Sequence, residues 1–173
     1  MVVPLEETNR PRWRTAAPIR WERVGWMAAL VTALLLLGWQ VQQLALPFQF
    51  DYVEGMMLHG AKVAASGETL YPEVGPLPVL ITAYPPLYYY LCAAGNALFG
   101  PSFFFGRAVS LAATVSVAMA IGLMVFRRVR SLAVAAPAAA FFYLTIPARN
   151  WAVLMRVDAL EVALAVWGFY AAV

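Results

Sequence analysis

Long apolar runs are the feature that most limits what this chain can fold into. A bilayer core about 30 Å thick needs roughly 20 helical residues, each rising about 1.5 Å, to cross it. Such runs extend over residues 21–46, 103–126 and 132–146, and a fourth begins near Val157 and is still apolar at Val173. With 63% hydrophobic and 12% charged residues, the chain is predicted to be an all-α polytopic membrane protein with about four spans.

Arginine clusters predict the orientation. Loops rich in Lys and Arg beside a membrane span stay on the cytoplasmic side. The basic segment 1–20 and residues 127–130 are therefore expected inside, and the loop 47–102 outside. Residues 21–46 form a run too long and too Trp-flanked for a cleavable signal, which predicts a retained anchor. The arginines that flank the first two runs are Arg10, Arg12, Arg14, Arg20, Arg23, Arg127, Arg128 and Arg130.

A short apolar stretch, residues 84–99, distinguishes two topologies. It offers about 14 residues after its proline pair, which is short for a crossing. If it crossed, Asp51 and Asp158 would lie on opposite faces of the membrane. If it lies in the interface with its tyrosines at headgroup depth, both aspartates are external. We expect the second arrangement, with a helix over 51–66, a Pro- and Gly-rich loop, and a second interfacial helix.

Composition excludes other classes of function. The net charge is only +3, and the basic residues cluster near helix ends, which does not suit a nucleic-acid surface. A single cysteine, Cys92, excludes a disulfide framework within the chain. The only histidine, His59, follows Glu54 by five residues, so a metal site is conceivable. One histidine without spaced companions is weak evidence for a metal, and the sequence favours an ordinary interfacial residue.

Ionisable residues beside the predicted spans are the candidates for chemistry. Asp51 and Glu54 are either a base or metal-ligating pair, or a helix cap with an acid in the first turn. Arg156, Asp158 and Glu161 lie close to hydrocarbon, where charged groups usually face a cavity or a partner; Arg156 and Asp158 are either a functional pair or interfacial residues that reach water. Arg107 is either a phosphate ligand or a simple interfacial anchor. Tyr88, Tyr89 and Tyr90 form either an aromatic belt or part of a lipid groove.

An ordered series of motifs resembles the N-terminal part of bacterial GT-C glycosyltransferases of the family 39 type, over about residues 21–173. These enzymes are relatives of the protein O-mannosyltransferases and of the aminoarabinose transferase of lipid A. The motifs are Asp51-x-x-Glu54-Gly55, Gly67-Glu68-x-Leu70-Tyr71, Tyr84-Pro85-Pro86-Leu87-Tyr88-Tyr89-Tyr90-Leu91, Leu98-Phe99-Gly100-Pro101-Ser102, Arg107 and Arg156-x-Asp158.

The resemblance implies a helical enzyme that transfers a sugar from a polyprenyl-phosphate carrier on the external face of the bacterial inner membrane. It matches Asp51 to the general base of the family and Asp158 to the acidic residue of the second external loop, with Glu54 as a further candidate catalytic residue. Tyr84, Arg107 and Arg156 are the candidates for the lipid-phosphate site, where Arg107, Arg156 or a divalent metal would stabilise the departing phosphate. Tyr84 replaces a lysine found in many relatives, which leaves the donor class open.

A second hypothesis belongs to a different class of function. A truncated relative without catalysis would serve as a membrane subunit of a larger complex, for example an energy-transducing one. Small residues would suit packing against such a partner. They are Gly95, Ala112, Ala113, Ser116, Ala118, Ala120 and Gly122.

Overall fold

The computed structural model describes residues 21–73 and 84–172, and helices are the only regular structure in these two ranges. The predicted all-α class is therefore confirmed, while the basic segment 1–20 and most of the predicted loop 72–78 lie outside the described residues. The helices are α1 (Trp21–Gln43), α2 (Tyr52–Ser66), α3 (Pro86–Phe99), α4 (Phe103–Val129), α5 (Leu132–Tyr143), α6 (Ile146–Trp151) and α7 (Asp158–Ala172).

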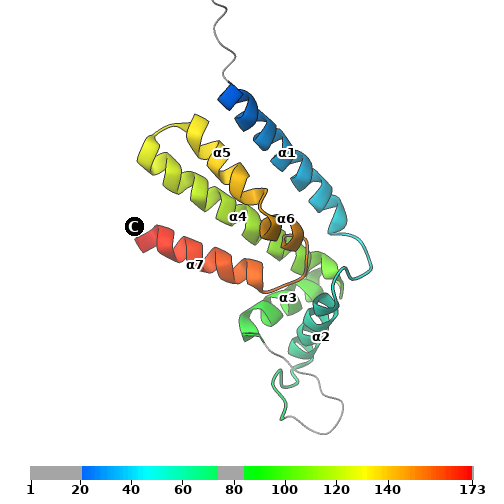
Figure 1. Cartoon of the computed structure of the whole chain (residues 1–173). Helices are drawn as coiled ribbons and strands as arrows, with labels where there is room; N and C mark the ends of the chain where they lie inside the picture. Colours follow the sequence, from blue (N-terminus) through cyan, green and yellow to red (C-terminus); the bar gives the residue numbers. More distant parts are fainter. Residues whose placement is uncertain (1–20, 74–83, 173) are drawn as a thin grey trace, which may run out of the picture.

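The helices α1, α4, α5 and α7 form an up-and-down bundle, and α2 and α3 cover one of its ends (Figure 1). In the bundle, α4 packs against both α5 and α7, and α5 also packs against α1. The helices α2 and α3 pack against each other and against α4, beside the beginning of α4 and the beginning of α7. We call this the capped end of the bundle; the opposite end carries the start of α1, the α4–α5 connection and the end of α7.

Two helices are long and apolar enough to cross a membrane, Arg23–Gln43 and Phe103–Val129. The other two predicted spans correspond to shorter helices, since α5 has 12 residues and α7 has 15 described residues. The helix α5 covers most of the run 132–146 and includes Pro137. The helix α6 begins at Ile146 with Pro147 in its first turn, where the missing N–H of proline removes no helical hydrogen bond.

The predicted external helix over 51–66 is confirmed as α2. The Asp51 carboxylate caps its first turn by accepting a hydrogen bond from the Val53 amide at 3.3 Å. Gly67 ends the helix with φ 79°, a left-handed conformation in which a side chain would be strained. The cap that was one of two interpretations for Asp51 is therefore present, and it leaves the second carboxylate oxygen for other contacts.

The two short helices share an apolar core with the segment between α6 and α7. Its fully buried members include Met57, Tyr88, Cys92 and Met155. The Tyr89 side chain of α3 packs directly on the α2 backbone here: a Cβ added at Gly60 would lie 2.5 Å from the Tyr89 ring. This core fixes α2 and α3 as one unit on the capped end.

The small residues expected to face a partner mostly pack inside the chain. Ala113, Ala118 and Ala120 are buried, and a Cβ added at Gly122 would contact the Ala139 side chain of α5 at 3.2 Å. Ala113 lies in a cluster with Ala163 of α7. The expectation of a partner-facing surface at these three alanines is therefore corrected: they allow α5 and α7 to approach α4.

Candidate functional site

A fully buried ion pair joins α2 to α4 at the capped end. Arg107 Nε donates to Glu54 Oε1 at 2.8 Å, and Arg107 Nη2 donates to Glu54 Oε2 at 2.9 Å. Both side chains have 0% exposure. This parallel two-bond geometry is the strong form of an arginine–carboxylate pair.

The remaining donors of Arg107 bind the chain just after α1. Its Nη1 donates to the carbonyl oxygens of Gln43 and Leu46, and its Nη2 donates to that of Phe48. The last carbonyls of a helix have no partner within the helix, and a cation is favourable beside them. Arg107 therefore fixes the exit of the first predicted span, and all its contacts among the described residues are internal.

The Glu54 carboxylate also binds two backbone amides that are far apart in sequence. It accepts from the Phe50 amide at 2.7 Å and from the Met155 amide at 2.8 Å. Burial alone would raise the pKa of Glu54, but Arg107 and these two amides outweigh it and hold the pKa below its ordinary value. The amides belong to the residues that precede Asp51 and Arg156, so one carboxylate positions both.

A second, partly exposed cluster lies beside this pair. Arg156 Nε donates to Asp158 Oδ2 at 2.8 Å, and Arg156 Nη1 donates to Asp51 Oδ2 at 3.4 Å. The side chains of Arg156, Asp51 and Asp158 are 18%, 26% and 33% exposed, so all three remain accessible from outside. We call these three residues the external triad. Because Asp51 and Asp158 share one arginine, the topology that placed them on opposite faces of the membrane is wrong.

Aromatic residues flank the Arg156 guanidinium. It lies 5.1 Å from the centre of the Trp151 ring. Burial would lower the pKa of Arg156, but the hydrogen bond and charge of Asp158, with contributions from Tyr84 and Asp51, raise it overall. Tyr84 packs half-buried against the α2–α3 core. The lipid-phosphate candidates Tyr84 and Arg156 therefore lie near each other, whereas Arg107 lies in the interior.

Several polar residues inside the predicted spans hold the site in place, and the sequence analysis did not single them out. Ser110 Oγ donates to the Arg156 carbonyl at 3.0 Å. Gln40 is fully buried in α1; its Nε2 donates to the Arg149 carbonyl at 2.8 Å, and its Oε1 accepts from the Tyr143 hydroxyl. The available signal was a polar side chain within an apolar run, which usually requires a partner.

A cleft of about 440 Å³ opens beside the external triad. Asp158 lies on its wall with the hydroxyl residues Thr114 and Thr145, and the remaining lining is apolar. The residues come from α4, α5, α6, α7 and the α5–α6 connection; they are Thr114, Val117, Phe142, Thr145, Pro147, Ala148, Trp151, Asp158, Ala159 and Val162. The cleft therefore combines one acidic group with a long apolar wall.

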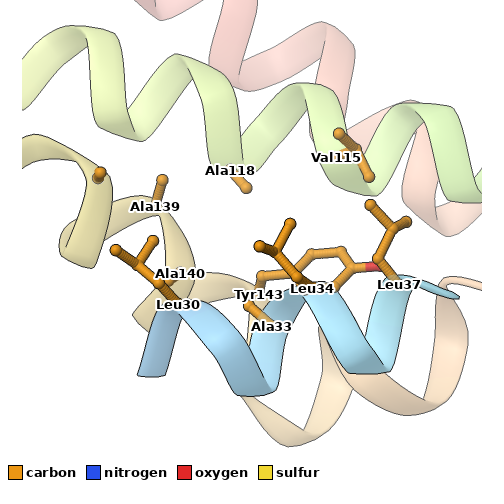
Figure 2. A pocket seen from close by; sticks show the side chains of 10 residues that line it. Leu30, Ala33, Leu34, Leu37, Val115, Ala118, Ala139, Ala140 and Tyr143 are labelled. Carbon is orange, nitrogen blue, oxygen red and sulfur yellow. The ribbon is translucent and has the colours of Figure 1, made fainter. Parts of the chain in front are cut away.

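A second hollow of about 260 Å³ lies between α1, α4 and α5 (Figure 2). Leu30, Leu34 and Leu37 of α1 face Val115 and Ala118 of α4 across it. Its lining offers no charged group, so this groove carries no candidate for chemistry.

A metal centre finds little support in the described ranges. Within them, no three side chains of His, Cys, Asp and Glu lie close enough together to bind one ion. His59 is exposed on α2. The cationic Arg156 lies between Asp51 and Asp158 and pairs with both.

Comparison with known proteins gave no match: no family model, no curated protein and no solved structure aligns significantly with this chain. The functional assignment therefore rests on the motifs and on the geometry of the capped end. The structure brings Asp51, Arg156 and Asp158 together, with Tyr84 nearby, and it separates Glu54 and Arg107 into a buried pair beneath them.

Proposed function

We propose that this chain is the N-terminal membrane region of a GT-C-type glycosyltransferase that uses a polyprenyl-phosphate sugar donor. In this proposal the N-terminus is cytoplasmic, the capped end faces the outside of a bacterial inner membrane, and α5 and α7 belong to two further spans. The observation that carries the proposal is the meeting of Asp51 and Asp158, from two separate connections, on the single cation Arg156.

The external triad has the residue types that inverting sugar transfer requires. A general base must reach the acceptor hydroxyl. Asp51 is accessible: its Oδ1 caps α2, and its Oδ2 accepts from Arg156 at 3.4 Å. A positioned cation stabilises negative charge that develops on the departing phosphate. Arg156 has this role in the proposal, and Asp158 orients its guanidinium through the shorter bond of 2.8 Å.

The cleft beside Asp158 supports a lipid-linked donor. Its apolar wall suits an isoprenoid chain, and its acidic rim adjoins the cation that would bind the phosphate. Polar groups at the mouth of an apolar pocket fix the orientation of an amphiphilic ligand. Tyr84 contributes an aromatic surface near Arg156 in place of a lysine.

Glu54 and Arg107 are positioning residues in this proposal and do not touch the substrate. Their side chains are buried and their hydrogen bonds are internal. The earlier expectation of a second catalytic carboxylate and of a phosphate-binding Arg107 is therefore replaced by a supporting role.

The alternative function, a non-catalytic membrane subunit, has one observation in its favour. The first span exposes large apolar side chains along its length, including Met27 at 66%, Leu34 at 67% and Leu35 at 70%. Lipid chains or the helices of a larger membrane complex would cover such a surface.

Transfer from a radiolabelled polyprenyl-phosphate sugar, assayed with natively expressed protein in gentle detergent, tests the enzyme proposal. We expect Asp51→Asn to abolish transfer, because the amide cannot accept a proton. The matched control is Glu68→Gln, which changes an exposed acid on the same external segment. Normal turnover by Asp51→Asn would remove Asp51 from the role of base. Absence of transfer by the wild type, together with a stoichiometric partner, would favour the subunit.

A further inference from the structure

A pocket of about 400 Å³ lies at the opposite end of the bundle from the external triad. Its lining consists of Met124, Arg127 and Arg128 of α4 and Tyr170 of α7. We call it the arginine pocket. It shares no residue with the cleft beside Asp158, so it needs an explanation of its own.

Within the part of the chain whose side chains the structure describes, neither arginine of the pocket has a counter-ion. Among the described residues, no acidic side chain forms an ion pair with either of them; the ion pairs of this part of the chain involve only Arg107 and Arg156. The Arg127 guanidinium lies 4.2 Å from the centre of the Tyr170 ring. Stacking of this kind holds the plane of the guanidinium while its N–H groups stay available for an anion.

The length of α4 determines where the arginine pocket lies across the membrane. Its 27 residues extend over about 40 Å at 1.5 Å per residue, which exceeds a hydrocarbon core of about 30 Å and approaches the full thickness with headgroups. Arg127 and Arg128 belong to its last turn. The last turn therefore reaches the layer in which lipid phosphates lie.

The lining also distinguishes a lipid from a free anion. Two guanidinium groups and a tyrosine form the polar rim, and Met124, one turn earlier on α4, supplies an apolar side. A phosphodiester followed by acyl chains matches both parts, whereas inorganic phosphate matches only the rim. Basic pockets between membrane helices on the cytoplasmic side bind acidic headgroups for this reason.

We propose that the arginine pocket binds the phosphate of an anionic phospholipid of the cytoplasmic leaflet. The proposal rests on the membrane placement given above, but not on sugar transfer. The bound lipid bridges the end of α4 to the end of α7 through Arg127, Arg128 and Tyr170.

Native mass spectrometry of the delipidated full chain, titrated with phosphatidylglycerol or phosphatidylcholine, tests this site. The wild type should retain one phosphatidylglycerol in preference to phosphatidylcholine. Each arginine near an anionic headgroup strengthens binding roughly fivefold, so Arg127→Gln/Arg128→Gln should weaken retention roughly 30-fold. Arg130→Gln/Arg149→Gln removes the same charge outside the pocket and should retain the lipid.

Three results would overturn the proposal: equal retention of the two lipids by the wild type, equal loss in both double variants, or displacement of phosphatidylglycerol by an equal concentration of inorganic phosphate. The wild-type comparison needs no variant, so a poorly folded mutant does not block the test. Asp51→Asn should bind phosphatidylglycerol normally. Lipid binding without transfer, or transfer without lipid binding, therefore separates this proposal from the enzymatic one.

Discussion

Glu54 and Arg107 form a fully buried bidentate ion pair, although they are 53 residues apart in the chain. The carboxylate of this pair also binds the amides of the residues that precede Asp51 and Arg156. The positions of Asp51 and Arg156 are therefore fixed by the Glu54 carboxylate, whose side chain is fully buried.

Loss of the Glu54 carboxylate should destabilise the protein strongly. Glu54→Ala leaves the Arg107 guanidinium buried without its counter-ion, which typically costs about 3–5 kcal/mol. Denaturant unfolding in detergent, followed by circular dichroism, measures the change. Glu68→Gln, at an exposed position of the same external segment, should change stability by about 0.5 kcal/mol or less. A Glu54→Ala protein as stable as the control would mean that the ion pair is dispensable.

The same carboxylate predicts a loss of stability in acid. Its folded-state pKa is lower than its ordinary value of 4.5, so its contribution is fully present above pH 4.5 and is lost as the pH falls through the lower folded value. The free energy of unfolding, measured at decreasing pH, should therefore fall in this window. Glu54→Gln, which does not titrate, should show a shallower pH dependence; identical slopes for the two proteins would contradict the assignment.

The contact between α2 and α3 can be tested with glycine substitutions. Gly60→Ala places a Cβ 2.5 Å from the Tyr89 ring, and overpacking of this kind costs about 1–3 kcal/mol. Gly38→Ala is the matched control, because nothing lies within 4 Å of the added Cβ in α1, and alanine is favoured over glycine in a helix by about 1 kcal/mol. Both variants gain this helix preference, so overpacking should place the unfolding temperature of Gly60→Ala below that of Gly38→Ala. Equal changes in the two variants would show that α2 and α3 are not in close contact at Gly60.

The proposed orientation predicts which positions a membrane-impermeant maleimide reaches in intact cells. Cysteines introduced as Glu68→Cys and Asn150→Cys should react, because both positions are exposed and lie in the two connections that the proposal places outside. Arg130→Cys, at the opposite end, should react only after the membrane is permeabilised. The wild type is the blank, since its only cysteine, Cys92, has 0% exposure. Labelling of Arg130→Cys but not Asn150→Cys in intact cells would show that the protein has the opposite orientation.

Local features of the fold were predictable where a few neighbouring residues determine them. Asp51 and Gly67 mark the two ends of α2, and their capping preferences are strong enough to be read from the sequence. Hydropathy likewise predicted the two long apolar helices, α1 and α4. It placed the end of the third run at Ile146, whereas α5 ends at Tyr143, because Leu144 and Ile146 beyond the helix are also apolar.

The candidate site was predictable in its members but not in their arrangement. Arg156 and Asp158 are two residues apart, so their pairing is local, and the motifs pointed to Asp51. The burial of Glu54 could not be foreseen, since its partners Arg107 and Met155 lie 53 and 101 residues away. A carboxylate with one neighbouring acid looks the same in the sequence whether it faces water or a guanidinium.

The buried amide of Gln40 has a consequence for the order in which the protein is assembled. Its partners, the Tyr143 hydroxyl and the Arg149 carbonyl, lie 103 and 109 residues later in the chain. In the proposed membrane placement, α1 would enter the membrane during synthesis before either partner exists, and a polar side chain without a partner is costly in lipid. The depth and rotation of the first helix are therefore fixed only when the α5–α6 segment has been made and inserted beside it.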